Sequence, residues 1–514
     1  MPAEIPRNLR ELVEWWQDKR ADQTCIFWQD EEVTYRQLNQ RANRVANGLR
    51  ALGVRKGDVV SVYLPNCPDY YYVWFGIVKL GAVFGPVNAL FKGDEVRHVL
   101  SDSGAVALIT SESLLDTINA IRDGCPALRH VVCLEGERPG ATAYTSLIDQ
   151  PEELEPVEID RNDLTSIVYT SGTTGKPKGA MISHWNMVWN TMAASDASPL
   201  QPGEGRLGLI LPLFHVNAQV TSLTQFLTGG AVVMWERFSP SDFWETVARY
   251  RPTTFSAVPT MLSILLVSPV KEGLDLSSLV YVICGAAPLP VEIFQRFEEK
   301  FDLRIVEGYG LTEGTCVSAL NPYWGVRKVG SIGLPIRGQP MKIVDDQMND
   351  VPPGEYGEIV LKGPNVMQGY YNNPEATAET IVDGWLRTGD MGYTDEDGYF
   401  FIVDRKKDMI IRGGENIYPR EIEEVLFTHP QIQEATVIAK PDPIWGEEVL
   451  AVVVPVAGAT LTEDEVKEYC RQRLADYKLP REVRFHTGLP KTLTGKVQKK
   501  VLKEELFGGG AEGR

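Results

Sequence analysis

Residues 169–179 constrain the chain most, because they read Tyr-Thr-Ser-Gly-Thr-Thr-Gly-Lys-Pro-Lys-Gly. Glycine lets a backbone turn sharply and approach a phosphate, while N–H groups, hydroxyls and lysines bind its oxygens. The preceding residues 164–169 are apolar and rich in β-branched side chains, which predicts a strand that leads into this loop. The segment therefore indicates a protein that handles a nucleotide triphosphate. Its expected phosphate-binding residues are Thr170, Ser171, Gly172, Thr173, Thr174, Gly175, Lys176 and Lys178.

This loop differs from a Walker-type phosphate loop. Only two residues separate Gly172 from Gly175, and Pro177 occupies the place where a Walker loop has the Ser or Thr that holds magnesium. Any magnesium ligand must therefore come from elsewhere in the chain. A polar surface loop is the alternative, but the density of glycines, hydroxyls and lysines after a strand favours the phosphate-binding interpretation.

The length and the order of apolar segments predict a multidomain α/β protein. A chain of 514 residues is too long for one hydrophobic core. Residues 59–64, 69–80 and 82–87 read as a strand, a helix and a strand, and such βαβ units recur to about residue 320. From residue 342 short strands alternate with glycine turns, which predicts a barrel-like or meander subdomain. After Asp404 a shorter α+β pattern follows, with helices over residues 419–427 and 463–474.

Composition narrows the partners and the compartment. The net charge of −18 argues against nucleic acid or an anionic membrane as a general partner. The seven cysteines occur singly, which suits a reducing compartment and gives no zinc-binding spacing. The N-terminus lacks an apolar signal core, and no stretch approaches membrane-spanning length. We expect a cytoplasmic monomer or homodimer, with peripheral membrane contact left open.

Several motifs in a fixed order resemble those of the adenylate-forming superfamily, which comprises acyl-CoA synthetases, adenylation domains of peptide synthetases and beetle luciferases. The resemblance rests on the loop above and on residues 33–39, 79–88, 308–313, 388–390, 404–408 and 490–496. It covers nearly the whole chain. Each string is short, but all of them in this order are specific to the superfamily.

The resemblance implies a division into domains. It implies a large AMP-binding N-terminal domain over residues 1–403 and a small mobile C-terminal domain over residues 409–507. Residues 404–408, Asp-Arg-Lys-Lys-Asp, would form the hinge between them, with Lys407 at the pivot and Arg405 near the nucleotide. Five charges in a row also predict a solvated linker. The Gly-rich residues 508–514 are expected to be disordered.

A nucleotide site follows from the residues and the resemblance together. Gly308 and Gly310 would let the backbone pass close to a flat ligand, and Tyr309 would stack on adenine. Glu313 offers the hard oxygen that magnesium requires, and Thr170 is a second candidate for the metal site. Asp390 fits the ribose hydroxyls. The resemblance adds Thr312 for the AMP phosphate and Gly285, Ala286 and Ala287 for the pocket wall. The alternatives are a solvated surface Glu313 and a turn-forming Asp390.

Two further residues are expected to take part in adenylation. Lys496 matches the catalytic lysine of the superfamily, which bridges the carboxylate and the phosphate as charge develops. His215 follows Phe214, where amino-acid-activating relatives have an aspartate that pairs with the α-amine. His215 resembles instead the gate residue of acyl- and aryl-CoA synthetases. Its alternative is a buried histidine with a structural role.

The acceptor of the adenylate could be CoA, a carrier protein or oxygen. Gly413 and Gly414 could let a thin pantetheine arm pass, and Trp445 and Tyr477 could line the CoA site, as in CoA ligases. The alternative for Trp445 is a core aromatic.

These observations predict an acyl-CoA synthetase that uses ATP, Mg²⁺ and CoA. Its motifs are most similar to those of fatty acyl-CoA and carnitine-type ligases, so we expect a fatty acid substrate, with an aryl or carnitine-type acid as an alternative. A carrier-protein-loading enzyme and a catalytically inactive nucleotide-binding scaffold are the rival interpretations.

Overall fold

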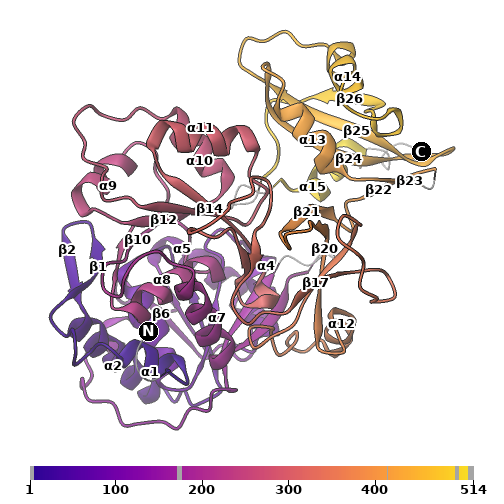
Figure 1. Ribbon diagram of the computed structural model, residues 1–514. Helices are drawn as coiled ribbons and strands as arrows, with labels where there is room; N and C mark the ends of the chain where they lie inside the picture. Colours follow the sequence, from indigo (N-terminus) through magenta and orange to yellow (C-terminus); the bar gives the residue numbers. More distant parts are fainter. Residues whose placement is uncertain (1–4, 171–175, 414, 492–496, 508–514) are drawn as a thin grey trace.

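The computed structural model of the protein describes residues 5–170, 176–413, 415–491 and 497–507. Four β-sheets, with helices between and around them, form this part of the chain (Figure 1). The expected α/β fold class is confirmed. No helix in the described ranges is long and apolar enough to cross a lipid bilayer.

The first sheet has seven strands and carries the predicted phosphate loop. Its strands pair in parallel except at the β8–β9 edge, where Thr170 pairs with Lys178 in an antiparallel hairpin. The expected βαβ unit is present, since β3, α3 (Pro68–Lys79) and β4 each lie within one residue of their predicted bounds. The strands, in spatial order, are β7 (Thr142–Ala143), β6 (His130–Cys133), β5 (Ala107–Thr110), β3 (Val59–Tyr63), β4 (Val83–Pro86), β8 (Leu164–Thr170) and β9 (Lys178–Ser183).

The second sheet has nine strands, and its six central strands are parallel. Parallel strands bring their carboxyl ends to one edge, where ligands of open α/β sheets bind. The strands, in spatial order, are β16 (Leu334–Pro335), β15 (Val317–Leu320), β14 (Arg304–Gly310), β13 (Tyr281–Cys284), β12 (Thr254–Ala257), β10 (Arg206–Leu209), β11 (Ala231–Met234), β1 (Thr24–Trp28) and β2 (Glu31–Thr34).

Helices join the cores of these two sheets. α3 is buried on almost every face, as expected for a helix with apolar residues all round. Tyr71 and Phe75 of α3 meet Phe226 of α8 edge-on, with ring centroids 5.3 and 5.6 Å apart. One apolar core therefore spans both sheets. The helices of this region are α1 (Leu9–Glu14), α2 (Tyr35–Ala51), α4 (Asp94–Asp102), α5 (Glu112–Ile121), α6 (Thr145–Ile148), α7 (His184–Asp196), α8 (Val216–Thr228), α9 (Phe243–Tyr250), α10 (Pro259–Val267) and α11 (Val291–Phe301).

The short-strand region is an antiparallel sheet of five strands, in agreement with the predicted meander. It lies beside the two larger sheets and below the C-terminal region in Figure 1. Its elements are β17 (Met341–Val344), β18 (Gly357–Leu361), α12 (Pro374–Thr380), β19 (Ile381–Val382), β20 (Trp385–Thr394) and β21 (Phe400–Arg405).

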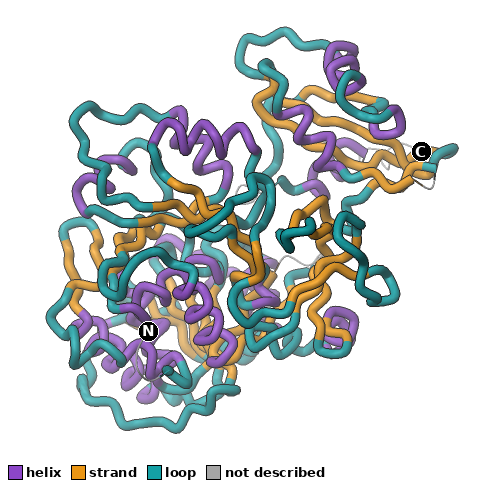
Figure 2. The backbone as a smooth tube through the Cα atoms, in the orientation of Figure 1, coloured by secondary structure: helices purple, strands orange, loops and turns teal. Residues whose placement is uncertain are grey.

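The fourth sheet and its helices form a separate body, drawn in yellow and orange at the upper right of Figure 1. Figure 2 shows its strands joined to the rest of the chain through loops. Helix α14 ends at Arg471, three residues before the predicted end, because Arg473 and Leu474 both donate to the Cys470 carbonyl in a closing turn. The elements are β22 (Ile410–Arg412), β23 (Glu415–Ile417), α13 (Pro419–Phe427), β24 (Ile432–Asp442), β25 (Gly446–Pro455), α14 (Glu463–Arg471), β26 (Glu482–Phe485) and α15 (Lys499–Phe507).

The segment predicted to be a solvated hinge is only partly solvated. Residues 406–408 form a turn between β21 and β22, but Asp404 and Arg405 belong to β21. Asp404 is only 9% exposed, and its carboxylate accepts from the backbone N–H of Arg405 (2.7 Å) and of Arg420 (3.0 Å). The expectation of a solvated run was therefore wrong for Asp404, because the amino end of α13 covers it.

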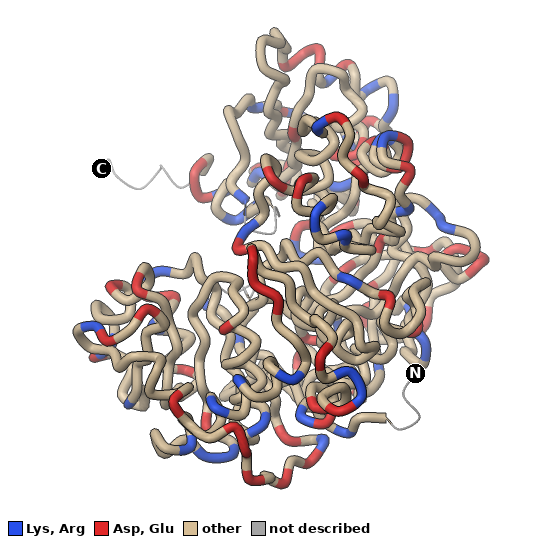
Figure 3. The backbone as a smooth tube through the Cα atoms, turned by 90° about the vertical axis from the view of Figure 1, so that its left-hand side faces the viewer, with Lys and Arg blue, Asp and Glu red and all other residues tan. Residues whose placement is uncertain are grey.

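Acidic and basic residues are interspersed on the side of the molecule that Figure 3 presents. The excess of acidic residues in the sequence is therefore spread along the chain rather than gathered in one segment.

Candidate active site

Two predicted wall segments meet at the carboxyl edge of the nine-stranded sheet. Gly285, Ala286 and Ala287 follow β13, and Gly308 lies near the end of the neighbouring β14. A side chain added at Gly285 would come within 2.8 Å of the Gly308 carbonyl oxygen. The two backbones are thus close enough to form one wall of a site.

Close packing explains the glycines at the end of β14. A Cβ on Gly310 would lie 1.4 Å from the Cys316 carbonyl oxygen, and one on Gly308 would lie 2.4 Å from the Leu320 side chain. Both obstacles belong to β15 and the turn before it. These glycines were predicted to let a ligand approach the backbone closely. The pairing of β14 with β15 already requires glycine at both positions.

Tyr309, Asp390 and Arg405 form a connected polar group. The Tyr309 hydroxyl donates to one oxygen of the Asp390 carboxylate (2.6 Å), and the Arg405 guanidinium pairs with the other (2.6 Å). Asp390 is only 4% exposed and lies within strand β20, so the alternative of a turn-forming residue is wrong. Burial and the Asp390 carboxylate raise the pKa of Tyr309, and Asp390 also raises the pKa of Arg405. The three predicted nucleotide residues therefore lie together.

Glu313 and Thr170 also lie side by side, although 143 residues separate them. The Thr170 hydroxyl donates to a Glu313 carboxylate oxygen (3.3 Å), which also accepts from the Tyr370 hydroxyl (2.8 Å). The Lys178 ammonium lies 5.1 Å from the centre of the Tyr370 ring. Thr312 begins the one-turn 3₁₀ helix that carries Glu313. Tyr370 was not predicted from the sequence. Its place after Gly369 in a loop is the signal that could have marked it as a site residue.

One carboxylate beside one hydroxyl fits magnesium better than a tighter-bound metal. Magnesium keeps several waters and usually takes one or two carboxylates plus substrate phosphates. Glu313 and Thr170 could supply that protein share, while the triphosphate supplies the rest. Lys176 is exposed and lies two residues before the start of β9. The other predicted loop residues, Ser171, Gly172, Thr173, Thr174 and Gly175, lie outside the described residues.

His215 is the N-cap residue of α8, at the carboxyl side of β10. Burial lowers its pKa to about 4, so the imidazole is neutral at pH 7. The loop before it is fixed by Asn66, whose amide donates to the Leu211 carbonyl (3.0 Å) and accepts from the Leu213 N–H (2.8 Å). Gln219 donates to the Leu213 carbonyl (3.0 Å) from the other side. The histidine thus stands on a rigid loop at the same edge as the nucleotide residues.

Glu307 is a buried acid next to this site that the sequence analysis missed. It lies on β14 beside Cys284, is 3% exposed, and burial raises its pKa to about 7. The charges that act on it come from Arg420 and Glu424 of α13. A strand glutamate before Gly308 gave no signal of burial in the sequence.

Two of the predicted CoA residues meet where the β22–β23 turn contacts the turn between β24 and β25. Gly413 donates to the Trp445 carbonyl (2.9 Å), and a Cβ at Gly413, whose φ is +60°, would lie 2.7 Å from the indole. Trp445 is 46% exposed with the Arg412 guanidinium 4.6 Å from its ring centre, so the core-aromatic alternative is wrong. Tyr477 is also partly exposed, on the small body. Gly414 and Lys496 lie outside the described residues.

Lys407 occupies the turn between the large and small bodies. Burial lowers its pKa. Its neighbour Lys406 donates its backbone N–H to the Gly389 carbonyl (2.9 Å), one residue before Asp390. The turn is therefore connected directly to the strand that carries the predicted ribose ligand.

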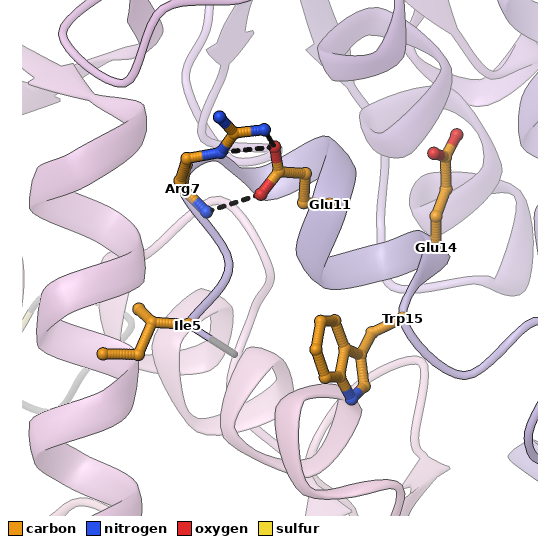
Figure 4. A pocket seen from close by; sticks show the side chains of 5 residues that line it. All are labelled: Ile5, Arg7, Glu11, Glu14 and Trp15. Atoms are coloured by element: carbon orange, nitrogen blue, oxygen red, sulfur yellow. Dashed lines mark hydrogen bonds and ion pairs between the residues drawn. The ribbon is translucent and has the colours of Figure 1, made fainter. Parts of the chain in front are cut away.

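A hollow on the surface beside α1 is unrelated to these residues (Figure 4). It is lined by Ile5, Arg7, Glu11, Glu14 and Trp15. Its charges are paired, since Arg7 binds Glu11 (2.8 Å) and Glu14 binds the buried Lys79 (2.8 Å). None of its lining residues belongs to the sheet edge described above.

Known proteins are similar to this chain in sequence and in fold. Residues 13–371 match the profile of the AMP-binding enzyme family, and residues 421–496 match that of the AMP-binding enzyme C-terminal domain. A feruloyl-CoA synthase from Amycolatopsis sp is 42% identical over 476 residues, covering 92% of this chain and 94% of that protein. A long-chain-fatty-acid–CoA ligase from Bacillus subtilis is 35% identical, covering 98% and 96%.

One relative has been solved both with and without ATP, and its two forms match this chain to different extents. ATP-bound MatB from Rhodopseudomonas palustris superimposes with a TM-score of 0.90 at 32% identity, covering 97% of this chain and 99% of that one. Apo MatB from the same organism superimposes with a TM-score of 0.80 at 32% identity, covering 98% and 99%. Because the sequence identity is the same, the difference lies in the conformation. The arrangement described here is closer to the ATP-bound form.

Proposed function

The chain belongs to the AMP-binding enzyme family and is an AMP-forming acid–thiol ligase, and we propose that it joins a hydrophobic carboxylic acid to CoA through an acyl-adenylate. The carboxylate would attack the α-phosphate of ATP and release pyrophosphate. The CoA thiol would then attack the acyl carbon and release AMP. The contacts that pair residue 170 with 313, 309 with 390 and 285 with 308 carry this proposal.

In the first half-reaction the described residues would bind and orient the nucleotide. Asp390 holds two polar partners on a buried carboxylate, and it would exchange one of them for ribose hydroxyls. Glu313 and Thr170 would hold magnesium, which when bound shields the charge of the phosphates. Thr312 would donate to the phosphate, and Lys496 would bridge the phosphate and the carboxylate.

The acid site is suited to a carboxylate without an ammonium group. His215 is uncharged at pH 7 and no aspartate follows Phe214. A neutral imidazole can donate a hydrogen bond without attracting a second charge. Beside it, the Ser256 hydroxyl donates to the Asn217 side chain (2.9 Å). We therefore propose an uncharged acyl tail rather than an amino acid.

Two substrate classes remain, and each has one observation in its favour. A fatty acid is favoured by the long-chain-fatty-acid–CoA ligase that aligns with 98% of the chain. An aromatic acid is favoured by the higher identity to a feruloyl-CoA synthase, 42%. The polar pair formed by Asn217 and Ser256 near His215 would suit an acid that carries oxygen substituents.

The acceptor is proposed to be free CoA rather than a carrier protein. Trp445 presents its ring to solvent at a turn of the small body, where it could stack on the CoA adenine beside the backbone of Gly413. We place the enzyme in the cytoplasm, because its cysteines are free. We propose that it is a monomer or a homodimer.

A screen of carboxylic acids by pyrophosphate release, with and without CoA, tests this proposal. We expect release with hydroxycinnamates or fatty acids, with CoA-dependent AMP turnover, and none with amino acids. Pyrophosphate release that CoA does not accelerate would indicate a carrier-protein acceptor. Glu313→Gln should abolish release, whereas Glu292→Gln, on the exposed face of α11, should leave it unchanged. Equal activity of Glu313→Gln and the parent would contradict the proposed site.

A further inference from the structure

Helix α4 contacts both ends of the hairpin loop between β8 and β9. His98 and Asp102 lie four residues apart, and thus on one face of this helix. The Asp102 side chain contacts Tyr169 on β8, the strand that enters the loop. The His98 side chain contacts Pro177, directly before β9, the strand that leaves it. Neither residue belongs to the nucleotide-binding set derived above.

The contact on the entering side is a short hydrogen bond. The Tyr169 hydroxyl donates to an Asp102 carboxylate oxygen at 2.6 Å, one residue before Thr170. Burial and the Asp102 carboxylate both raise the pKa of Tyr169, so its hydroxyl remains a protonated donor at physiological pH. The backbone carbonyl of Asp102 also accepts from the Asn372 side chain (3.1 Å), close to Tyr370.

The contact on the leaving side uses the histidine ring. His98 Nε2 lies 2.8 Å from the Pro177 carbonyl oxygen, one residue before Lys178. Because a carbonyl can only accept, the hydrogen must be on Nε2. The His98 and Tyr169 rings meet edge-on, with centroids 6.1 Å and planes 81° apart. The two contacts therefore form one group that joins both strands to α4.

These contacts fix the mouth of the loop without using the ligand. Thr170 and Lys178 form the last paired residues of the β8–β9 ladder, and the contacts from α4 fall on the residues directly before each of them. Ordering the backbone costs conformational entropy for every residue that is fixed. If the fold has already ordered the two ends, nucleotide binding has less to order.

We propose that His98 and Asp102 are positioning residues that hold Thr170 and Lys178 in the geometry that receives the ATP polyphosphate. This inference rests on the proposed role of residues 170–178 as the phosphate loop. The two residues act through Tyr169 and Pro177 and touch no reacting atom.

The proposal is tested by measuring the two half-reactions separately in His98→Ala, His98→Gln and Tyr169→Phe. We expect His98→Ala and Tyr169→Phe to lower kcat/KM for ATP in pyrophosphate release by about tenfold, the size set by one lost buried hydrogen bond. Thioester formation from pre-made acyl-AMP and CoA should be unchanged. His98→Gln should recover most of the loss, because the glutamine amide can donate to the same carbonyl. Arg97→Ala is the matched control, since Arg97 is exposed on α4 and, among the residues that the structure describes, forms its ion pair with Asp94 alone.

Three results would overturn the proposal. They are an ATP dependence of His98→Ala equal to that of Arg97→Ala, equal loss of both half-reactions, and failure of His98→Gln to recover activity while its melting midpoint equals the parent's. Lys178→Ala tests the assumption that residues 170–178 form the phosphate loop. If Lys178→Ala leaves the KM for ATP unchanged, the loop itself does not bind ATP, and the proposed function fails rather than the role of α4.

Discussion

Glu307 illustrates, at the scale of a single residue, how burial changes chemistry next to the site. Its carboxyl group has an ordinary pKa of 4.5, which burial raises to about 7. Below the ordinary value the group is protonated in both the folded and the unfolded protein, so its burial carries no ionic cost. Between the ordinary value and about 7 the unfolded protein ionises while the folded protein keeps its proton, so stability falls over this range and levels off above it.

Glu307→Gln should therefore make stability less dependent on pH. Compared with the parent, the variant should gain up to roughly 3 kcal/mol between about pH 4.5 and pH 7, since each pKa unit corresponds to about 1.4 kcal/mol. Melting midpoints of both proteins across this range measure the effect. A difference that stays constant with pH would show that Glu307 titrates normally in the folded protein.

The glycine at the end of β14 gives a second prediction at this scale. Gly310→Ala places a Cβ 1.4 Å from the Cys316 carbonyl oxygen, so one of two paired strands must shift. We expect a loss of more than about 3 kcal/mol, in the upper range for single substitutions, together with loss of adenylation. Denaturant unfolding measures it.

Gly488→Ala is the matched control for that substitution. Gly488 has no positive φ and no atom within 4 Å of an added Cβ, so its stability should change by less than about 0.5 kcal/mol. Equal stability of the two variants would mean that β14 and β15 are not held this closely.

Residue types and their order were enough to identify Tyr309, Glu313 and Asp390 as candidates, but not the bonds among them. The Tyr309–Asp390 hydrogen bond joins residues 81 positions apart, and Tyr370 joins Glu313 across 57. Such pairs depend on how separate sheets and loops pack against one another. The burial of Glu307 and the exposure of Trp445 depend on packing in the same way.

At the scale of elements, the β24–β25 turn carries the proposed CoA contact. Trp445→Ala should raise the KM for CoA by about 5- to 150-fold and leave the KM for ATP unchanged, because loss of base stacking costs roughly 1–3 kcal/mol. Since the ring is half exposed, the melting midpoint should not fall. Trp324→Ala, at a tryptophan 73% exposed elsewhere on the chain, should change neither constant. A lowered midpoint with both KM values raised would contradict this role.

Local sequence predicted elements well where one pattern dominated. Strands β3 and β4 and the helix between them follow from apolar runs that end in turn residues. The charges of residues 404–408 predicted exposure to solvent. Asp404 is buried instead, because its strand pairs with β20 and the amino end of α13 covers it. Tertiary contacts override the local pattern there.

At the scale of the whole molecule, a small set of contacts joins the two bodies. Arg420 of α13 donates from its guanidinium to the Ile402 carbonyl (2.9 Å), while its backbone N–H donates to Asp404. Both acceptors belong to β21, on the other side of the turn at residues 406–408. The positive charge of Arg420 also acts on buried Glu307. These contacts belong to the arrangement that resembles the ATP-bound relative.

If the small body rotates about Lys407 between the half-reactions, the bond from Arg420 to Ile402 must break each time. Arg420→Ala should then weaken the described arrangement and lower the rate of pyrophosphate release by about tenfold, as expected for one lost charged hydrogen bond. Thioester formation from pre-made acyl-AMP should be unchanged or faster. Arg420→Gln, which keeps an amide donor, should lie between the alanine variant and the parent. Arg471→Ala, at an exposed pair on α14, is the control and should alter neither half-reaction. If Arg420→Ala slows both half-reactions equally at an unchanged melting midpoint, the contact does not select between the two arrangements.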